Sequence, residues 1–203
     1  MRATRPRPPH ATALATALVA GLLTACGGGD TPDCPRPKNV LLLVADTLRA
    51  DRLGCYGYPR ETSPNIDALA ARGMVYERAY SQACWTVPSM ISMMTGVSVT
   101  VEETVMPDVA VLAEVLRDAG LETAAFPANN TLFAERGFER GYDFFEPSPN
   151  VNGPALAARF EAWLGARSDP DRPFFAWVQF IDPHDPYEPA PEHDLFTGER
   201  VDE

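Results

Sequence analysis

Four residues in this sequence have side chains suited to chemistry, and a folded sheet could bring them together. Asp46, Asn129 and His184 each follow an apolar segment, and Thr86 precedes a segment with the features of a helix. In open parallel sheets, ligands bind beyond the carboxyl ends of the strands. If the apolar segments are such strands, the four side chains lie at one edge of the sheet.

Asp46 and Thr86 together have the chemistry of half a metal site. A carboxylate at a strand end is the hard oxygen ligand that a divalent cation prefers. A Thr hydroxyl is a weak nucleophile alone, but it becomes effective when a metal ion stabilises its alkoxide. Because Thr86 lies just before a predicted helix, its hydroxyl is also near unpaired backbone N–H groups, which can bind phosphate or sulfate. Spacing alone leaves a second interpretation open, in which Thr86 caps the helix and Asp46 is a loop residue.

The elements that would position these residues alternate between strands and helices. Continuous rather than alternating apolar runs indicate strands that are covered on both faces. The predicted strands are Asn39–Ala45, Met74–Ala79, Glu122–Phe126 and Phe174–Ile181. The predicted helices are Thr62–Arg72, Pro88–Thr95, a helix capped by Asp108 and stopped by Gly120, and Pro154–Ala166. This order predicts an α/β fold with a mostly parallel sheet flanked by helices.

The N-terminal residues have the pattern of an export signal. Arginines without acidic residues precede the apolar run Ala11–Leu23, which is shorter than the ~20 residues that span a bilayer. Leu23-Thr-Ala-Cys26 resembles a bacterial lipobox, so we expect residues 1–25 to be a lipoprotein signal peptide and Cys26 to be lipidated. Residues 26–38 then form a flexible tether. An ordinary cleaved signal peptide with an incidental cysteine is the alternative.

These features predict an exported protein held in the cell envelope, in the periplasm or at the outer membrane, by its lipid anchor only. The chain has 17 Lys and Arg against 28 Asp and Glu, a net charge of −11. Removal of residues 1–25 takes away three arginines and no acid, which makes the charge −14. Such a surface repels nucleic acid and anionic lipid head groups. The remaining Cys34, Cys55 and Cys84 allow one disulfide, but the sequence does not select the pairing.

The motifs of this chain resemble the opening of the sulfatase family within the alkaline phosphatase superfamily. The resemblance is carried, in the family's order, by Asn39–Tyr58, Thr62–Met74, Ala83–Ser89, Thr95–Gly96, Leu112–Ala124 and Pro183–Tyr187. It implies that Asp46 is a ligand of a divalent metal ion (Ca, Mn, Mg or Zn) and that Thr86 occupies the nucleophile position at the metal. It also implies that His184 contacts the transferred anionic group, that Asn129 contacts substrate, and that Arg49 and Asp51 have supporting roles.

Three departures from the family pattern bear on activity. Sulfatases use a Cys or Ser, oxidised to formylglycine, in a Cys/Ser-x-Pro-x-Arg pattern, whereas this chain has Thr86 and Met90 at those positions. Cys84 lies two residues too early to be the oxidised residue. The chain also lacks the usual His-containing loop between Gly96 and Asp108. The site therefore resembles the Thr-using, phospho-transferring branch of the superfamily.

The resemblance further implies a later Asp-His pair, often with a Lys, which would lie beyond Glu203. We therefore expect residues 39–203 to be the N-terminal part of a sulfatase-like domain, with the metal site completed elsewhere. The leading hypothesis is a metal-dependent hydrolase of sulfate, phosphate or phosphonate esters of small molecules, glycans or lipids. The alternatives are a catalytically inactive surface lipoprotein with a binding role, and a phospho-group transferase such as those that act on lipid head groups. Oligomeric state is left open.

Overall fold

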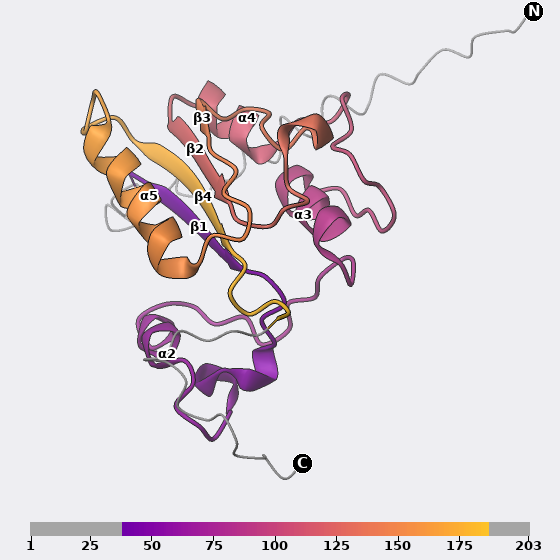
Figure 1. The fold of residues 1–203 in the computed structure, drawn as a ribbon, viewed down its shortest axis with the longest axis vertical. Coiled ribbons are helices and arrows are strands. Elements are labelled where there is room, and N and C mark those ends of the chain that lie inside the picture. Colours follow the sequence, from indigo (N-terminus) through magenta and orange to yellow (C-terminus); the bar gives the residue numbers. More distant parts are fainter. Residues whose placement is uncertain (1–37, 187–203) are drawn as a thin grey trace, which may run out of the picture. The chain divides into compact units, whose positions relative to one another are not determined.

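The computed structural model describes residues 38–186, which form a parallel sheet with helices on both faces (Figure 1). The strands are β1 (Val40–Ala45), β2 (Glu122–Pro127), β3 (Phe144–Phe145) and β4 (Phe174–Phe180), in the order β1-β4-β2-β3. The helices are α2 (Pro64–Ala70), α3 (Thr86–Thr95), α4 (Leu112–Asp118) and α5 (Gly153–Ala166). Short 3-10 turns lie at Ala50–Arg52, Gly54–Tyr56 and Ala134–Arg136. All strand pairs are parallel, so the predicted α/β fold class is confirmed.

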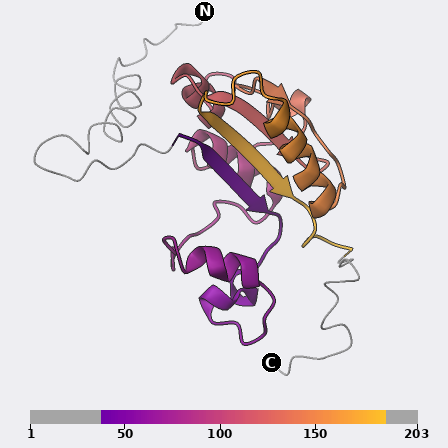
Figure 2. The same cartoon turned by 90° about the vertical axis from the view of Figure 1, so that its left-hand side faces the viewer.

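Each face of the sheet packs against its own helices. On one face, Trp177 and Phe175 are fully buried against α3 and α4 with Val87 and Ile91. On the other face, Phe126, Val178 and Leu156 of α5 form a second cluster. Figure 2 shows α5 beside the inner strands and β1 at the margin of the sheet. Because β4 and β2 are covered on both sides, their sequences are almost continuously apolar.

α5 begins and packs as its sequence predicts. Asn152 caps the helix, because its side-chain oxygen accepts a hydrogen bond from the Ala155 backbone N–H at 3.1 Å. Pro154 lies in the first turn, where its missing N–H costs nothing. Among residues 38–186, no helix is long and apolar enough to cross a membrane.

Two expected elements differ in the structure. Met74–Ala79 is not a strand: no described strand pairs with it, and Met74 and Tyr76 are 78% and 67% exposed. Asp108 does not cap α4, which begins later, at Leu112, and the Glu114 carboxylate accepts from the Val111 N–H at 3.1 Å. Residues with high β-propensity form a strand only where they can pair with the edge of another strand. An aspartate caps a helix only when it is the residue directly before the first helical turn.

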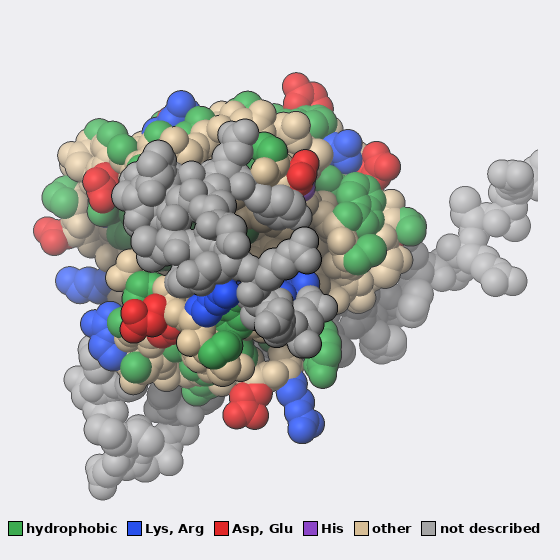
Figure 3. Space-filling model, turned by 60° about the horizontal axis from the view of Figure 1, so that its bottom comes forward, with side chains coloured by type: hydrophobic (Ala, Val, Ile, Leu, Met, Phe, Trp, Pro, Cys, Tyr) green, Lys and Arg blue, Asp and Glu red, His purple; other side chains and the backbone are tan. Residues whose placement is uncertain are grey.

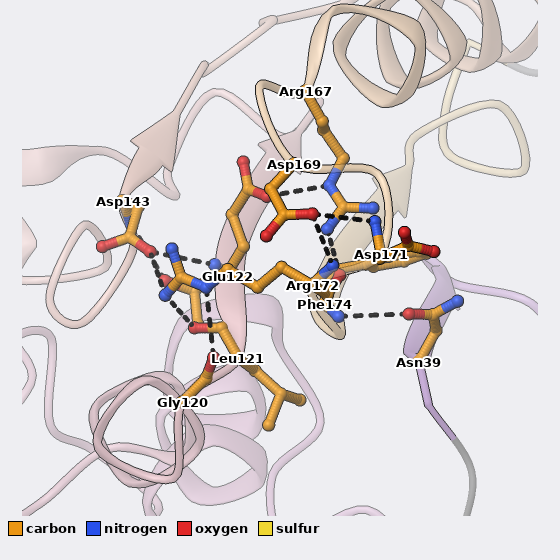
Figure 4. A network of polar contacts seen from close by, with 11 residues as sticks. Asn39, Gly120, Leu121, Glu122, Asp143, Arg167, Asp169, Asp171, Arg172 and Phe174 are labelled. Atoms are coloured by element: carbon orange, nitrogen blue, oxygen red, sulfur yellow. Dashed lines mark hydrogen bonds and ion pairs between the residues drawn. The ribbon is translucent and has the colours of Figure 1, made fainter.

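An arginine-rich network joins the amino ends of the strands (Figure 4). The Arg172 guanidinium donates to the carbonyls of Gly120 and Leu121 at 3.1 and 3.0 Å, just before β2. Arg167, at the end of α5, donates from Nε to Glu122 Oε2 at 2.8 Å and from Nη2 to the Arg172 carbonyl. Its guanidinium also lies over the Trp163 ring. These bonds fix the connection between α5 and β4 against the start of β2.

Replacement of Arg167 by alanine is expected to lower the free energy of unfolding by about 3 kcal/mol. The Arg167 side chain is only 3% exposed, and removing one partner of a buried ion pair leaves the other uncompensated. Arg159→Ala is the matched control on α5, because the Arg159–Glu146 pair is 43% and 37% exposed and such pairs contribute about 0–1 kcal/mol. Urea unfolding followed by circular dichroism gives both values. Equal losses in the two variants would contradict a buried structural role for Arg167.

Candidate active site

The register of the parallel strands places three polar side chains at the carboxyl edge of the sheet. Gln179 on β4 pairs with Val44 of β1 and with Pro127 of β2. The Asp46 backbone N–H, directly after β1, donates to the Phe180 carbonyl at 2.9 Å. Asn129 lies two residues beyond the end of β2. The carboxyl ends of these strands therefore converge on Asp46, as the apolar segments predicted.

The Asp46 carboxylate is buried, with 8% of the residue exposed, and is surrounded by donors. Its Oδ2 accepts from Asn129 Nδ2 at 2.6 Å and from Gln179 Nε2 at 3.0 Å. Thr86 Oγ1 lies 3.4 Å from Oδ1 and 3.3 Å from Oδ2. A buried carboxylate is stabilised only when such partners replace water. Two of the four predicted residues, Asn129 and Thr86, therefore contact a third, Asp46.

Backbone N–H groups set the orientation of both amides. Gln179 Oε1 accepts from the backbone N–H of Ala128 at 3.0 Å and of Asn129 at 2.8 Å. Asn129 Oδ1 accepts from the N–H of Thr131 at 2.9 Å and from its hydroxyl at 2.6 Å. With their oxygens engaged in this way, the two amides must turn their NH₂ groups toward Asp46. Both amides bind Oδ2, and Oδ1 has the Thr86 hydroxyl as its described side-chain partner.

Thr86 is the first residue of α3 rather than the residue before the helix. The first N–H groups of a helix have no partner within it, and its positive end favours anions. Asn129 Nδ2 lies 3.4 Å from Thr86 Oγ1. The helix start and the amide donor favour negative charge on this oxygen during a reaction, whereas the Asp46 carboxylate is placed to accept the hydrogen bond of the hydroxyl.

His184 lies in the segment that follows β4, but its hydrogen bonds are local. Its backbone N–H donates to the Ile181 carbonyl at 2.8 Å, and Nδ1 contacts the Asp185 carbonyl at 2.9 Å. No described hydrogen bond joins its imidazole to Asp46, Thr86 or Asn129. Cys26, the predicted lipidation site, lies outside the described residues.

Gln179 is the site residue that sequence reasoning missed. It is fully buried and belongs to an otherwise apolar strand. A buried amide needs partners for both of its ends, so a single Gln inside the run Phe174–Phe180 was the available signal. Gln179 Nε2 donates to the Asp46 carboxylate at 3.0 Å, so this buried amide holds Asp46 in place.

The described residues can supply part of a divalent metal site. Asp46 Oδ1 and Thr86 Oγ1 are oxygen donors of the kind that Ca²⁺, Mg²⁺ and Mn²⁺ bind. The amides cannot serve as ligands in the observed orientation, because their N–H groups face Asp46. Within residues 38–186, no group of three or more His, Cys, Asp and Glu side chains could hold an ion. The oxygen donors of Asp46 and Thr86 therefore fit a hard cation.

Met90 and the cysteines do not add charged groups to the site. Met90 is 3% exposed and packs in the core with Val87 and Ile91. Cys55 and Cys84 are free thiols, and Cys34 lies outside the described residues. Desolvation and the neighbouring Asp67 carboxylate raise the pKa of the Cys55 thiol. No described hydrogen bond joins either of these two cysteines to the Asp46 cluster, although Cys84 lines the same pocket as Thr86.

Fold and site together define an α/β protein with an acid and an alcohol at the carboxyl edge of its sheet, and the fold is similar to that of a Vibrio parahaemolyticus protein of the alkaline phosphatase superfamily (TM-score 0.58, 21% identity, covering 76% of this chain and 43% of that chain). The sulfatase family model matches residues 38–199, and the chain therefore belongs to the sulfatase family. Members of this family use a divalent metal ion.

A curated relative is similar to this chain in sequence, and two solved structures are similar to it in fold. The chain is 40% identical over 83 residues to arylsulfatase A of Homo sapiens, a match that covers 41% of this chain and 14% of that protein. It thus spans about one seventh of that relative's length. The phosphonate monoester hydrolase of Agrobacterium radiobacter has a similar structure, with a TM-score of 0.62, 22% identity and coverage of 78% of this chain and 43% of that chain. BT4656, solved with its substrate D-glucosamine-2-N,6-O-disulfate, has a similar structure, with a TM-score of 0.62 and 20% identity. The match covers 76% of this chain and 36% of that chain.

Proposed function

We propose that Thr86 and Asp46 are the nucleophile and a metal ligand of a site that cleaves sulfate, phosphate or phosphonate esters. The observation that carries the proposal is the placement of Thr86 Oγ1 within 3.4 Å of both oxygens of the buried Asp46 carboxylate. The pair lies at the carboxyl edge of the sheet and lines a pocket of 510 Å³. An alcohol, a carboxylate and an adjacent pocket are what a covalent ester transfer requires.

The reaction would proceed in two displacements at Thr86. Its hydroxyl loses its proton to solvent as the oxygen forms a bond to sulfur or phosphorus, the bond to the ester oxygen breaks, and the alcohol leaves with a proton from solvent. Water then attacks the sulfur or phosphorus of the Thr86 ester and releases sulfate, phosphate or phosphonate, and the Thr86 oxygen regains a proton. Asp46 holds the hydroxyl in position by accepting its hydrogen bond. A bound divalent cation would stabilise the alkoxide and screen the anionic group.

The other roles in the proposal follow the family resemblance. Asn129 Nδ2 donates to Asp46 at 2.6 Å and lies 3.4 Å from Thr86 Oγ1, so its second N–H is positioned to donate to an anion bound at Thr86 in place of the hydroxyl. His184, in the segment after β4, is proposed to contact the same anion. Residues outside 38–186 are proposed to complete the metal shell. We also propose that the protein is exported and anchored in the cell envelope by a lipid on Cys26.

Removal of the metal is expected to abolish activity reversibly. Protein expressed from its complete gene is expected to release nitrophenol from 4-nitrophenyl phosphate, sulfate or phenylphosphonate when a divalent cation is present. Treatment with EDTA should reduce the rate by at least about 100-fold, and one of Ca²⁺, Mn²⁺, Mg²⁺ or Zn²⁺ should restore it, since the anion and the alkoxide would lose their counter-charge. Turnover that is unchanged by EDTA would contradict the proposal.

Met90 supports a second candidate, a non-catalytic surface lipoprotein that keeps the fold for binding. Its buried thioether occupies the position where the family resemblance expects an arginine. Calorimetric titration with Ca²⁺, Mn²⁺ and Zn²⁺ separates the two candidates. Folded protein that binds none of these ions would favour the non-catalytic role, whereas binding together with turnover excludes it.

A further inference from the structure

The pocket beside Thr86 has an apolar and aromatic lining. Its walls include Leu48, Tyr80, Trp85, Met90 and Met93. Tyr80 is 79% exposed and Trp85 is 43% exposed, unusually high values for large rings. Tyr80, Trp85 and Thr86 lie within seven residues of sequence, so the segment that leads into α3 presents both the rings and the hydroxyl. Exposed rings beside a reactive group provide a surface on which a flat apolar group can stack.

The charges of the lining restrict what can enter. Among the described residues that line the pocket, Asp46 is the charged one, and no Lys or Arg is present. Arg49, which follows the lining residue Leu48, donates to Asp51 Oδ1 from its Nε at 2.9 Å. A second anionic group on a substrate would therefore find no Lys or Arg among the described residues of these walls. It would also meet a chain whose net charge is −11.

Three of the neutral polar side chains of the lining already form hydrogen bonds. Ser81 Oγ and Ser89 Oγ lie 2.8 Å apart, and Ser81 Oγ also donates to the Ala83 carbonyl at 2.7 Å. Gln82 Nε2 donates to the Tyr80 carbonyl at 3.1 Å. A sugar ring with several hydroxyls would have to displace these bonds to form its own.

On the face that carries α2, acidic and basic side chains lie interspersed with apolar ones in the part not drawn grey (Figure 3).

We infer that this pocket binds the alcohol part of the ester, and that it selects an uncharged aromatic or similarly flat apolar group over a sugar or an anionic one. The inference rests on the proposed function, because it assumes that the anion is held at Thr86. Tyr80 and Trp85 are assigned as specificity-determining residues that stack on the leaving group.

The test compares esters whose alcohols have similar leaving ability: benzyl phosphate, 4-carboxybenzyl phosphate and glucose 6-phosphate, or the corresponding sulfates if these are the esters turned over. Benzyl phosphate is expected to have a kcat/KM at least about tenfold higher than either of the others. Tyr80→Ala and Trp85→Ala should each lower kcat/KM for benzyl phosphate by about fivefold to tenfold and leave that for glucose 6-phosphate nearly unchanged. Tyr76→Ala is the control, because Tyr76 is an exposed ring outside the lining.

Calorimetric binding of benzylphosphonate, which has no ester bond to cleave, separates failure of the inference from failure of the proposed function. Turnover that favours glucose 6-phosphate, or equal losses in all three variants, would overturn the inference while the proposed function stands. A third outcome is that no ester is turned over, but the parent protein binds benzylphosphonate and Tyr80→Ala binds it about tenfold more weakly. This outcome would retain the assignment of the pocket and overturn the proposed catalytic function. Absence of both turnover and binding would overturn both.

Discussion

Thr86→Ala is expected to reduce ester hydrolysis by at least about 10³-fold, because the variant has no oxygen with which to attack sulfur or phosphorus. The fold should survive, since the Thr86 hydroxyl makes only long hydrogen bonds of 3.3–3.4 Å to its neighbours. The methyl group that remains still fits at the start of α3. Initial rates with 4-nitrophenyl esters at saturating metal measure the loss, and thermal unfolding checks the fold.

Thr86→Ser is the matched control for this prediction. Serine keeps the hydroxyl and can occupy the first turn of α3, so we expect it to retain activity within about tenfold of the parent protein. A covalent phosphoryl or sulfuryl group on residue 86, detected by mass spectrometry after rapid acid quench, should appear in the parent and serine proteins and be absent from the alanine variant. Undiminished turnover by Thr86→Ala would show that another group attacks the ester.

Asp46→Asn is expected to weaken metal binding by at least about 100-fold and to abolish measurable turnover. The substitution keeps the shape of the side chain but removes the negative charge that a hard cation requires. It also brings an NH₂ group into a site where Asn129 and Gln179 already direct theirs toward residue 46. If the oxygen of the new amide accepts from Asn129 and Gln179, its NH₂ group faces the Thr86 hydroxyl, which then loses its acceptor at that position.

Calorimetry and initial rates measure the two effects of Asp46→Asn separately. Asp118→Asn is the control, because it removes one negative charge from an exposed position at the end of α4. It should leave both metal affinity and rate unchanged, which excludes a general effect of net charge. Wild-type metal affinity in Asp46→Asn would show that Asp46 does not bind the ion.

Most of the sheet could be predicted because β1, β2 and β4 are continuous, mostly apolar runs, of which β2 and β4 are buried and β1 is partly exposed. The runs around β1, β2 and β4 are recognisable without knowledge of their neighbours, and the polar residues at their ends follow from chain direction alone. Met74–Ala79 could not be assigned correctly in this way. Its composition suits a strand, but strand formation depends on an available partner edge, which the described residues do not provide for it.

What the sequence by itself determined is the fold class, the family and the two residues proposed for chemistry, Asp46 and Thr86. These depend on local patterns: apolar runs, the residues at their ends, and motif spacing. Only the tertiary structure decided that Gln179 and Asn129 hold one oxygen of Asp46, because strand register brings together positions 133 and 83 residues apart. It also decided that the described residues lining the pocket beside Thr86 include no Lys or Arg. The contacts to Asp46 depend on packing between distant segments, to which hydrophobic periodicity along the chain is insensitive.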